Sequence, residues 1–230
     1  MAYRRRRRLK FRRRFNNRRR KIPIIIEKKF TDWEPALNDP GSSTNGDGGS
    51  GVGGQSKYIN IKDSAESNGV WRVGTLAQGN SETQRDGNHV TLVKITYKLF
   101  FYQQAASPTN TDVLVKFALV LDKRAQEDFI PELAALLEGD GTVMEFNERN
   151  AYHSQFKTLL TKTAHLIADS PKSSKFCQGS INCNILQSYD DTAAADITRN
   201  PLYAYLISEN ITADDEWRAK IQLRFHYVDN

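Results

Sequence analysis

The segment from residue 217 to residue 227 alternates apolar and polar side chains without interruption, and it restricts the fold more than any other feature of the sequence. Successive side chains of a β-strand point to opposite faces, so a period of two collects the apolar residues on one face. They are Trp217, Ala219, Ile221, Leu223, Phe225 and Tyr227, and Arg218, Lys220, Gln222, Arg224 and His226 occupy the other face. The segment is therefore predicted to be a strand with one buried face.

Two further segments have the same period and predict a protein made mainly of β-strands. One buried set is Val93, Ile95, Tyr97, Leu99 and Phe101, opposite the polar set Lys94, Thr96 and Lys98; the other buried set is Val113, Val115, Phe117, Leu119 and Leu121. We expect additional strands at 22–30 and near 155–168, 176–188 and 202–208.

Residues 129–139 (FIPELAALLEG) predict one short helix, because Pro131 stands in its first turn and Gly139 just past its end. Many strands, long loops and one helical crossover are typical of a two-sheet sandwich of the jelly-roll type. We therefore predict an all-β protein: an eight-stranded antiparallel jelly-roll sandwich with one short crossover helix.

The N-terminal segment carries most of the positive charge of the chain. Its basic residues are Arg4, Arg5, Arg6, Arg7, Arg8, Lys10, Arg12, Arg13, Arg14, Arg18, Arg19, Arg20 and Lys21. Residues 1–29 hold 15 of the 33 Lys and Arg residues and one acidic residue, so their net charge is +14. Subtracting +14 from the whole-chain charge of +6 leaves −8 for the other 201 residues.

The charge split predicts two parts of the chain with different behaviour. Like charges repel and little can be buried in residues 1–21, so we expect a disordered arm. Residues 22–230 are expected to form the folded domain, in which the Gly/Ser-rich residues 38–56 form a flexible loop.

A basic arm on an acidic domain is expected to bind a polyanion, and the sequence favours single-stranded nucleic acid. We find no lipidation motif, secretory signal or apolar stretch long enough for a membrane span, so we expect no membrane insertion. Arginine presents a planar fork to phosphate oxygens. Two roles are open for Tyr3, Phe11 and Phe15: stacking on unpaired bases, or packing against the domain. The basic runs also resemble a nuclear localisation signal, which would bind nuclear import receptors.

No motif for catalysis or for a cofactor is recognisable, and we expect a protein that is not an enzyme. The histidines His89, His153, His165 and His226 form no H-x-D or H-x-H pair, and neither G-x-S-x-G nor a P-loop occurs. The acidic pairs Asp190–Asp191 and Asp214–Asp215 are predicted to be solvated loop carboxylates, with a weak calcium site as the alternative.

Two cysteines, Cys177 and Cys183, stand six residues apart. On a strand this spacing places both on one face, too far apart to form a disulfide. We expect two reduced thiols.

Residues 76–99 (LAQGNSETQRDGNHVTLVKITYKL) combine Gln-Gly, a polar loop, Gln-Arg-x-Gly and a long β segment. This order resembles the single jelly-roll capsid proteins of circular Rep-encoding single-stranded DNA viruses, and the satellite tobacco necrosis virus capsid protein shares it. EKKFTDW (27–33), VLVKFALVLDKR (113–124), NAYHSQFKTLLTKTAHL (150–166) and LRFHYVDN (223–230) are similar to family segments in the same order. The resemblance covers residues 1–230. Thr161 departs from it where the family commonly has Asp, as does the Gly-rich insertion at 38–56.

Within the resembling stretch, we expect Gln84, Arg85 and Gly87 to have a structural rather than a binding role. Gly87 follows Arg85-Asp86 at a turn, where a positive φ angle is expected.

The resemblance implies a structural viral protein: a capsid subunit of a T=1 icosahedral virion with sixty copies. Its arms would point inward for DNA packaging, with assembly in the host nucleus. A capsid of a small RNA or satellite virus is one alternative, and a non-viral nucleic-acid-binding module with a basic tail is another.

Three basic residues of the last strand extend this hypothesis. If the polar face of that strand lines the shell interior, Arg218, Lys220 and Arg224 would enlarge the nucleic-acid-binding surface. The alternative is that they form salt bridges between sheets or between subunits.

Overall fold

The computed structural model describes residues 28–34, 59–60, 70–81, 83–103, 112–124, 155–168, 173–190, 197–209 and 217–229, and all structural statements concern this part of the chain. Its regular secondary structure consists of β-strands only, and every pairing between strands is antiparallel. The predicted all-β class is therefore confirmed. The predicted arm (1–21), loop (38–56) and helix (129–139) lie outside the described residues.

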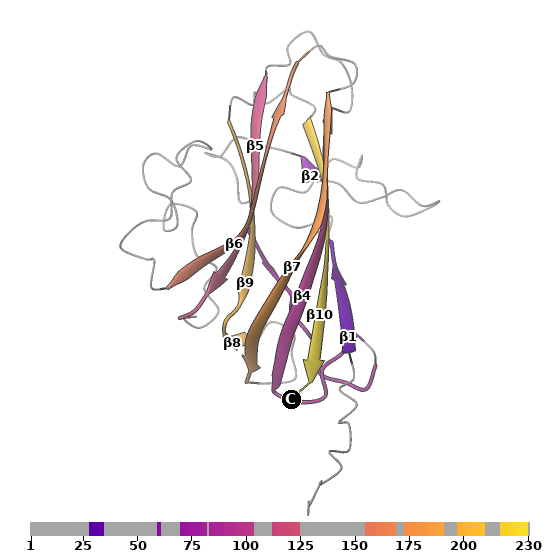
Figure 1. Ribbon diagram of the computed structural model, residues 1–230, viewed down its shortest axis with the longest axis vertical. Coiled ribbons are helices and arrows are strands. Elements are labelled where there is room, and N and C mark those ends of the chain that lie inside the picture. Colours follow the sequence, from indigo (N-terminus) through magenta and orange to yellow (C-terminus); the bar gives the residue numbers. More distant parts are fainter. Residues whose placement is uncertain are drawn as a thin grey trace, which may run out of the picture.

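The strands form two sheets that lie face to face (Figure 1). The larger sheet has the spatial order β1 (Lys28–Trp33), β10 (Trp217–Asp229), β4 (His89–Gln103), β7 (Ser174–Tyr189) and β8 (Ile197–Arg199), and β2 (Ile59–Asn60) pairs with β10. The smaller sheet has the order β3 (Val70–Val73), β9 (Leu202–Glu209), β5 (Val113–Asp122) and β6 (Phe156–Leu166). The described residues thus contain ten strands rather than the predicted eight, because the short strands β2 and β8 are added.

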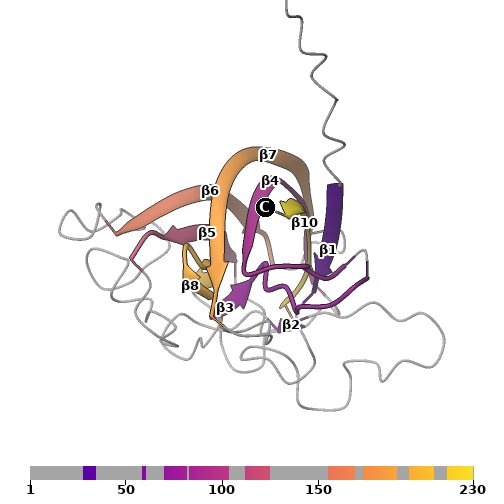
Figure 2. The same cartoon turned by 90° about the horizontal axis from the view of Figure 1, so that it is seen from below.

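The other eight strands pair in a nested order. β1 pairs with β10, β3 with β9, β4 with β7, and β5 with β6. The first four of these strands therefore pair with the last four in reverse order, as the two arms of one long hairpin would. Each sheet receives two of these four pairs. Seen from below in Figure 2, β5 and β6 lie on one side of the molecule and β10 and β1 on the other.

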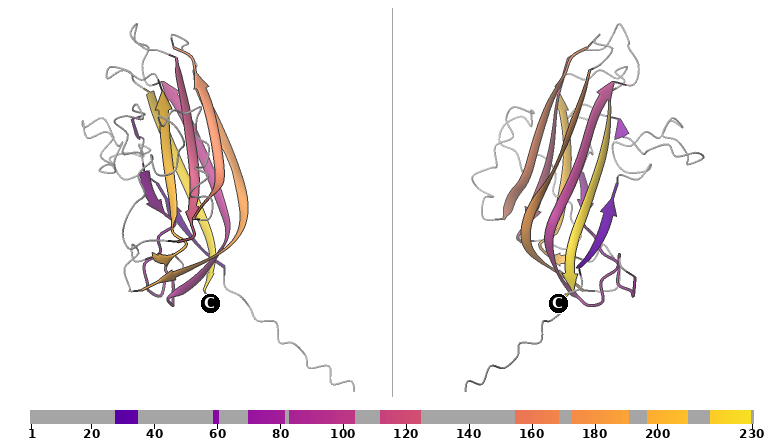
Figure 3. Two further views of the ribbon diagram at one scale, coloured as in Figure 1. Left: turned by 90° about the vertical axis from the view of Figure 1, so that its left-hand side faces the viewer. Right: turned by 45° about the vertical axis from the view of Figure 1, so that its right-hand side comes forward.

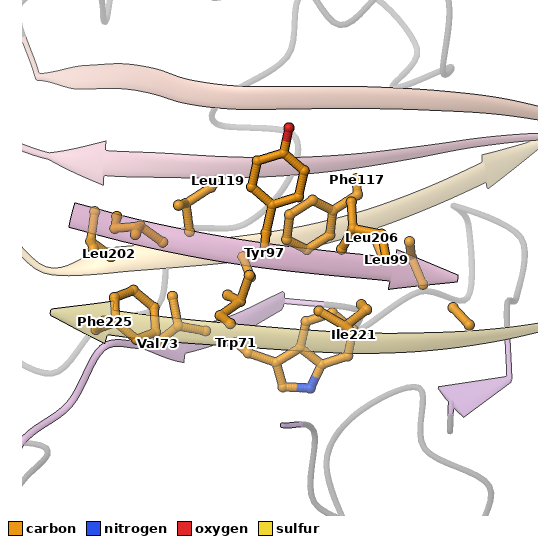
Figure 4. Close-up of a cluster of buried hydrophobic side chains, with 14 of the residues drawn as sticks. Trp71, Val73, Tyr97, Leu99, Phe117, Leu119, Leu202, Leu206, Ile221 and Phe225 are labelled. Atoms are coloured by element: carbon orange, nitrogen blue, oxygen red, sulfur yellow. The ribbon is translucent and has the colours of Figure 1, made fainter. Parts of the chain in front are cut away.

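Side chains of both sheets meet in one apolar core (Figure 4). All six apolar residues of the 217–227 segment are buried in it, as their alternation predicted. Tyr97 and Leu99 of β4 join them, and Phe117 and Leu206 pack from the smaller sheet. The core consequently fixes which face of the larger sheet remains available to solvent.

Strand β5 differs from its predicted pattern, because both of its faces are buried. Besides the expected set, Ala118 and Val120 are buried in a second cluster with Phe156, Tyr203 and Tyr205. β5 lies between β9 and β6, and its sequence VLVKFALVL is nearly continuous in apolar residues. A near-continuous apolar run is typical of a strand buried on both faces, so the interpretation of one buried face was wrong here.

Cys177 and Cys183 lie on β7, and both are half-buried against the core. They are free thiols, as predicted. The Sγ atom of Cys183 lies 3.4 Å from the carbonyl oxygen of Leu92. Burial raises the pKa of the Cys183 thiol to about 11.

The connection from β3 to β4 is built around the side chain of Arg85, which is fully buried. Its Nε donates to the carbonyl oxygen of Leu76 at 3.0 Å, and its Nη1 donates to that of Gly87 at 2.6 Å and to Asn88 Oδ1 at 3.2 Å. The guanidinium carbon lies 4.2 Å from the centre of the Tyr189 ring. Arg85 therefore has a structural role, as expected from the sequence.

Of the two other expectations for this connection, the structural role of Gln84 is confirmed and the positive φ at Gly87 is not. Gln84 is also structural, because its Oε1 accepts a hydrogen bond from the Ser81 backbone at 3.2 Å. The positive φ expected at Gly87 was wrong: among the described glycines it occurs at Gly74, with φ of 70°. The Gly87 carbonyl accepts a hydrogen bond from Arg85, whereas a Cβ at Gly74 would lie 3.1 Å from the Phe225 ring.

Candidate nucleic-acid interface

The solvent side of the larger sheet carries a group of basic residues that we call the basic face. It comprises the outward residues of β1, β10, β4 and β7, the four strands that lie side by side in the right panel of Figure 3. Its exposed or half-buried basic residues are Lys28, Lys94, Lys98, Lys220 and Arg224, and its acidic residues are Asp32 and Glu34. The balance of charge on this face is therefore positive.

The strand register places the residues of the basic face in rows across the sheet. Lys98 of β4 lies opposite Gln222 of β10 on one side and Gln178 of β7 on the other. In the next row along β4, Thr96 lies between Arg224 and Ser180. Cross-strand neighbours of this kind are in side-chain contact range, so the rows form a continuous surface of cations, amides and hydroxyls.

Two adjoining hollows occupy this surface. The larger is an open groove of about 610 Å³ whose lining includes Lys94, Lys98 and Arg224. The smaller has a volume of about 200 Å³, and its lining includes Phe100 and Phe176. Gln222 and Lys98 line both hollows, so the two hollows adjoin each other on this face.

Arg224 lies in the larger groove and is held by a bidentate ion pair to Asp32 on the neighbouring strand β1. Its Nε and Nη2 donate to the two carboxylate oxygens at 2.6 and 2.7 Å, and its guanidinium lies over the Phe30 ring at 4.5 Å. The hydrogen bonds from Arg224 lower the pKa of the Asp32 carboxyl below its ordinary value of 3.8. Arg224 thus forms a salt bridge within one sheet, although both partners remain about half exposed.

Arg218 and Lys220 differ in their access to the basic face. Arg218 is 8% exposed and donates to the carbonyl oxygen of Trp217 at 3.5 Å. Lys220 is half-buried, and its ammonium lies 5.5 Å from the centre of the Tyr102 ring. Of the three basic residues predicted on this strand, Lys220 and Arg224 reach the grooves and Arg218 does not line them.

Sequence reasoning did not select Lys94 and Lys98 as binding residues, although it placed both on the polar face of their strand. Their position on the basic face follows from the pairing of β4 with β10, which sets them beside Gln222 and His226. Burial first, and then the charges of Lys94 and Arg224, lower the pKa of His226, so its imidazole is mainly neutral at pH 7.

The basic face is close in sequence to the arm. The predicted arm ends at residue 21, and β1 begins at Lys28 as an edge strand of the same sheet. The next residue, Lys29, is 5% exposed, and its Nζ lies 2.9 Å from carboxylate oxygens of both Asp86 and Asp229. These two ion pairs tie the start of β1 to the β3–β4 connection and to the end of β10. The predicted nucleic-acid-binding residues of the arm, Tyr3 to Lys21, lie outside the described residues.

The described residues that were candidates for a metal or catalytic site have separate partners. His89 Nδ1 lies 3.1 Å from Ser188 Oγ, and His165 Nε2 lies 3.8 Å from Asp112. The described ranges contain no group of three or more His, Cys, Asp or Glu residues arranged to hold a metal ion. Asp190 is exposed, and His153, Asp191, Asp214 and Asp215 lie outside the described residues.

No protein-family model matches the sequence, and no curated protein is similar enough to it to count as a relative. In the described part of the chain, no helix has the length and apolar character needed to cross a membrane. The function must therefore be argued from the charges and the arrangement of this protein's own residues.

Proposed function

We propose that the protein is the capsid protein of a small virus, which assembles into a T=1 icosahedral shell of sixty copies and packages single-stranded DNA. The observation that carries the proposal is the basic face of the larger sheet, which follows the +14 N-terminal segment in sequence. The rest of the chain has an excess of acidic residues. A subunit with its positive charge on one side is suited to enclose a polyanion.

The strand pairing supports a jelly roll, which is the fold that this function needs. A jelly roll has eight strands in two antiparallel sheets, and viral capsid domains are among the proteins that use it. Nested pairing of β1 with β10, β3 with β9, β4 with β7 and β5 with β6 is what a long hairpin wrapped into a jelly roll would have. Lectins and cupins share this fold, so the charge distribution, and not the fold, favours a capsid.

In the proposed mechanism, assembly and packaging depend on each other. The basic face and the arm line the interior, and the genome phosphates neutralise charges that would otherwise repel one another. DNA is favoured over RNA because the arm is dominated by arginine and resembles a nuclear localisation signal, which suits assembly in the nucleus. The virion is then the final location of the protein.

Deletion of residues 2–21 tests the role of the arm. The truncated protein is expected to fold and to lose most of its packaged nucleic acid, measured as the ratio of absorbance at 260 and 280 nm of purified particles. A matched variant with every arm arginine changed to lysine keeps the charge and should still package. Normal nucleic-acid content in the truncated protein would show that the arm is not the packaging element.

The full-length chain tests the assembly and the choice of nucleic acid. Size exclusion and electron microscopy should show closed particles, and DNase but not RNase should digest the extracted contents. Small soluble species that bind oligonucleotides would instead favour the nucleic-acid-binding module. RNase-sensitive contents would favour the capsid of an RNA or satellite virus.

The double variant Lys94→Gln and Lys98→Gln tests the basic face separately. Each lost phosphate contact should reduce the slope of log affinity against log salt by about 0.7 for single strands, so the slope should fall by about 1.4. The matched control is Lys123→Gln with Lys157→Gln, two exposed lysines that lie outside the basic face. Equal slopes in both double variants would contradict a binding role for this face.

A further inference from the structure

Three aromatic side chains gather at one end of the basic face. Phe100 and Tyr102 of β4 are stacked with ring centres 5.0 Å apart and planes 15° apart. Phe176 of β7 is the direct cross-strand partner of Phe100, and their ring centres lie 6.5 Å apart at 61°. These residues lie on the solvent side of the sheet, and the core cluster does not include them. The rings therefore form an aromatic surface outside the core.

One ring of this surface is largely exposed, and the other two are half-buried. Phe176 is 53% exposed and is one of three large hydrophobic side chains that are exposed in the described residues. Exposed aromatic groups of this kind frequently mark a binding surface. The cluster also borders the smaller hollow, whose lining includes both Phe100 and Phe176.

Positive charges flank the aromatic cluster on the same face. Lys220 of β10 is the cross-strand partner of Phe100 on the side opposite to Phe176, and Lys98 precedes Phe100 by two residues on β4. Both lysines line the smaller hollow. Glu34 is the acidic residue of this lining, and its Oε1 accepts a hydrogen bond from Gln222 at 2.8 Å. An anionic group would therefore be favoured on the side of the two lysines.

We propose that Phe100 and Phe176 form a stacking site for an unpaired nucleobase, with the adjacent phosphates bound by Lys98 and Lys220. The inference rests on the proposed function and deepens it, because it specifies a single strand with unstacked bases as the ligand of the basic face. Aromatic rings beside a basic groove bind single strands with little sequence preference, since every base has a π face. An apolar peptide would use the rings but would have no need of the two cations.

Photo-crosslinking of the full-length chain tests the position of the base. A single-stranded oligonucleotide containing 5-iodouracil is irradiated with the protein, and the attachment sites are mapped by peptide mass spectrometry. Crosslinks are expected on Phe100, Tyr102 or Phe176. If the oligonucleotide binds but crosslinks only to the arm, the stacking site is refuted and the proposed function stands. If the protein neither binds the oligonucleotide nor forms particles with nucleic acid, the proposed function itself fails.

Affinity measurements test the energetic role of the rings. The double variant Phe100→Leu and Phe176→Leu is compared with the native chain on a thymidine oligonucleotide and on an abasic strand of equal length. We expect the native preference for the base-containing strand to fall by about tenfold, within the range for one base–aromatic contact. The salt dependence should not change, because no charge is removed. An unchanged preference would refute the proposal.

A matched control separates stacking from general apolar contact. Leu186 is another exposed hydrophobic residue of β7, and it lies opposite Thr91 near the other end of β4. Leu186→Ala should leave the preference for bases unchanged, and an equal loss in this variant would refute a specific site. The single variant Phe176→Leu provides a second test of the preference for the base-containing strand. Its side chain is 53% exposed, so its replacement should have little effect on folding.

Discussion

The substitution Arg85→Lys should destabilise the domain strongly even though it preserves the positive charge. The guanidinium of Arg85 is fully buried and donates to Leu76, Gly87 and Asn88 from two of its nitrogens, in different directions. A lysine ammonium is a single point donor and cannot reproduce this fork. We therefore expect buried acceptors of the β3–β4 connection to lose their partners.

The expected decrease in the free energy of unfolding follows from the contacts that lysine cannot make. A hydrogen bond from a charged group contributes about 1.5–3 kcal/mol, and two of the three should be lost. The guanidinium also leaves the face of the Tyr189 ring, at a cost of about 1 kcal/mol or more. Allowing for partial replacement by the ammonium, the free energy of unfolding should fall by about 3–5 kcal/mol. For a chain of this length, that corresponds to a lowering of Tm by about 10 °C.

Denaturant unfolding followed by tryptophan fluorescence measures this change. The native and variant chains must be compared at one subunit concentration without nucleic acid, because assembly and binding both raise apparent stability. Arg199→Lys is the control, since Arg199 is exposed on β8 and its replacement should change stability by less than about 0.5 kcal/mol. A loss below about 1 kcal/mol in Arg85→Lys would refute the argument that the fork organises this connection.

Two further predictions concern the larger sheet. Gly179→Ala should destabilise the domain by about 1–3 kcal/mol in the same unfolding assay. The reason is that the new Cβ would lie 2.6 Å from Tyr97 Oη and 2.8 Å from its Cζ. Unchanged stability in this variant would mean that the Tyr97 ring moves freely. Asp32→Asn should change the pH dependence of stability. Arg224 lowers the folded pKa of Asp32 below 3.8, so the stabilisation is complete above about pH 5 and is lost as the pH falls through 3.8 and the folded pKa. The variant should lack this loss, and parallel stability curves for the two proteins down to pH 2 would contradict the role of the ion pair.

The sequence alone predicted which face of each strand is buried where polar and apolar residues alternate strictly. In β10, the apolar residues from Trp217 to Tyr227 all lie in the core. The same local rule placed Cys177 and Cys183 on one face as free thiols. It was wrong for β5, where the buried outer face depends on Tyr203 and Tyr205 of the neighbouring strand. It was also wrong for Val93 of β4, which is half-buried at a register shift between Leu92 and Lys94, while Leu92 is buried instead. Alternation is a local property, so it determines the direction of a side chain but not what covers it.

The neighbours of each strand were decided only by the tertiary structure. Lys98, Gln178 and Gln222 are separated by long stretches of chain, and only the pairing of β4 with both β7 and β10 brings them into one row. The same pairing sets Phe100 between Lys220 and Phe176. Register between distant strands depends on how the whole core packs, because any strand of suitable length offers the same backbone hydrogen bonds. The sequence by itself therefore determined the charge of the N-terminal segment and the β class, and the fold decided which polar residues form the basic face.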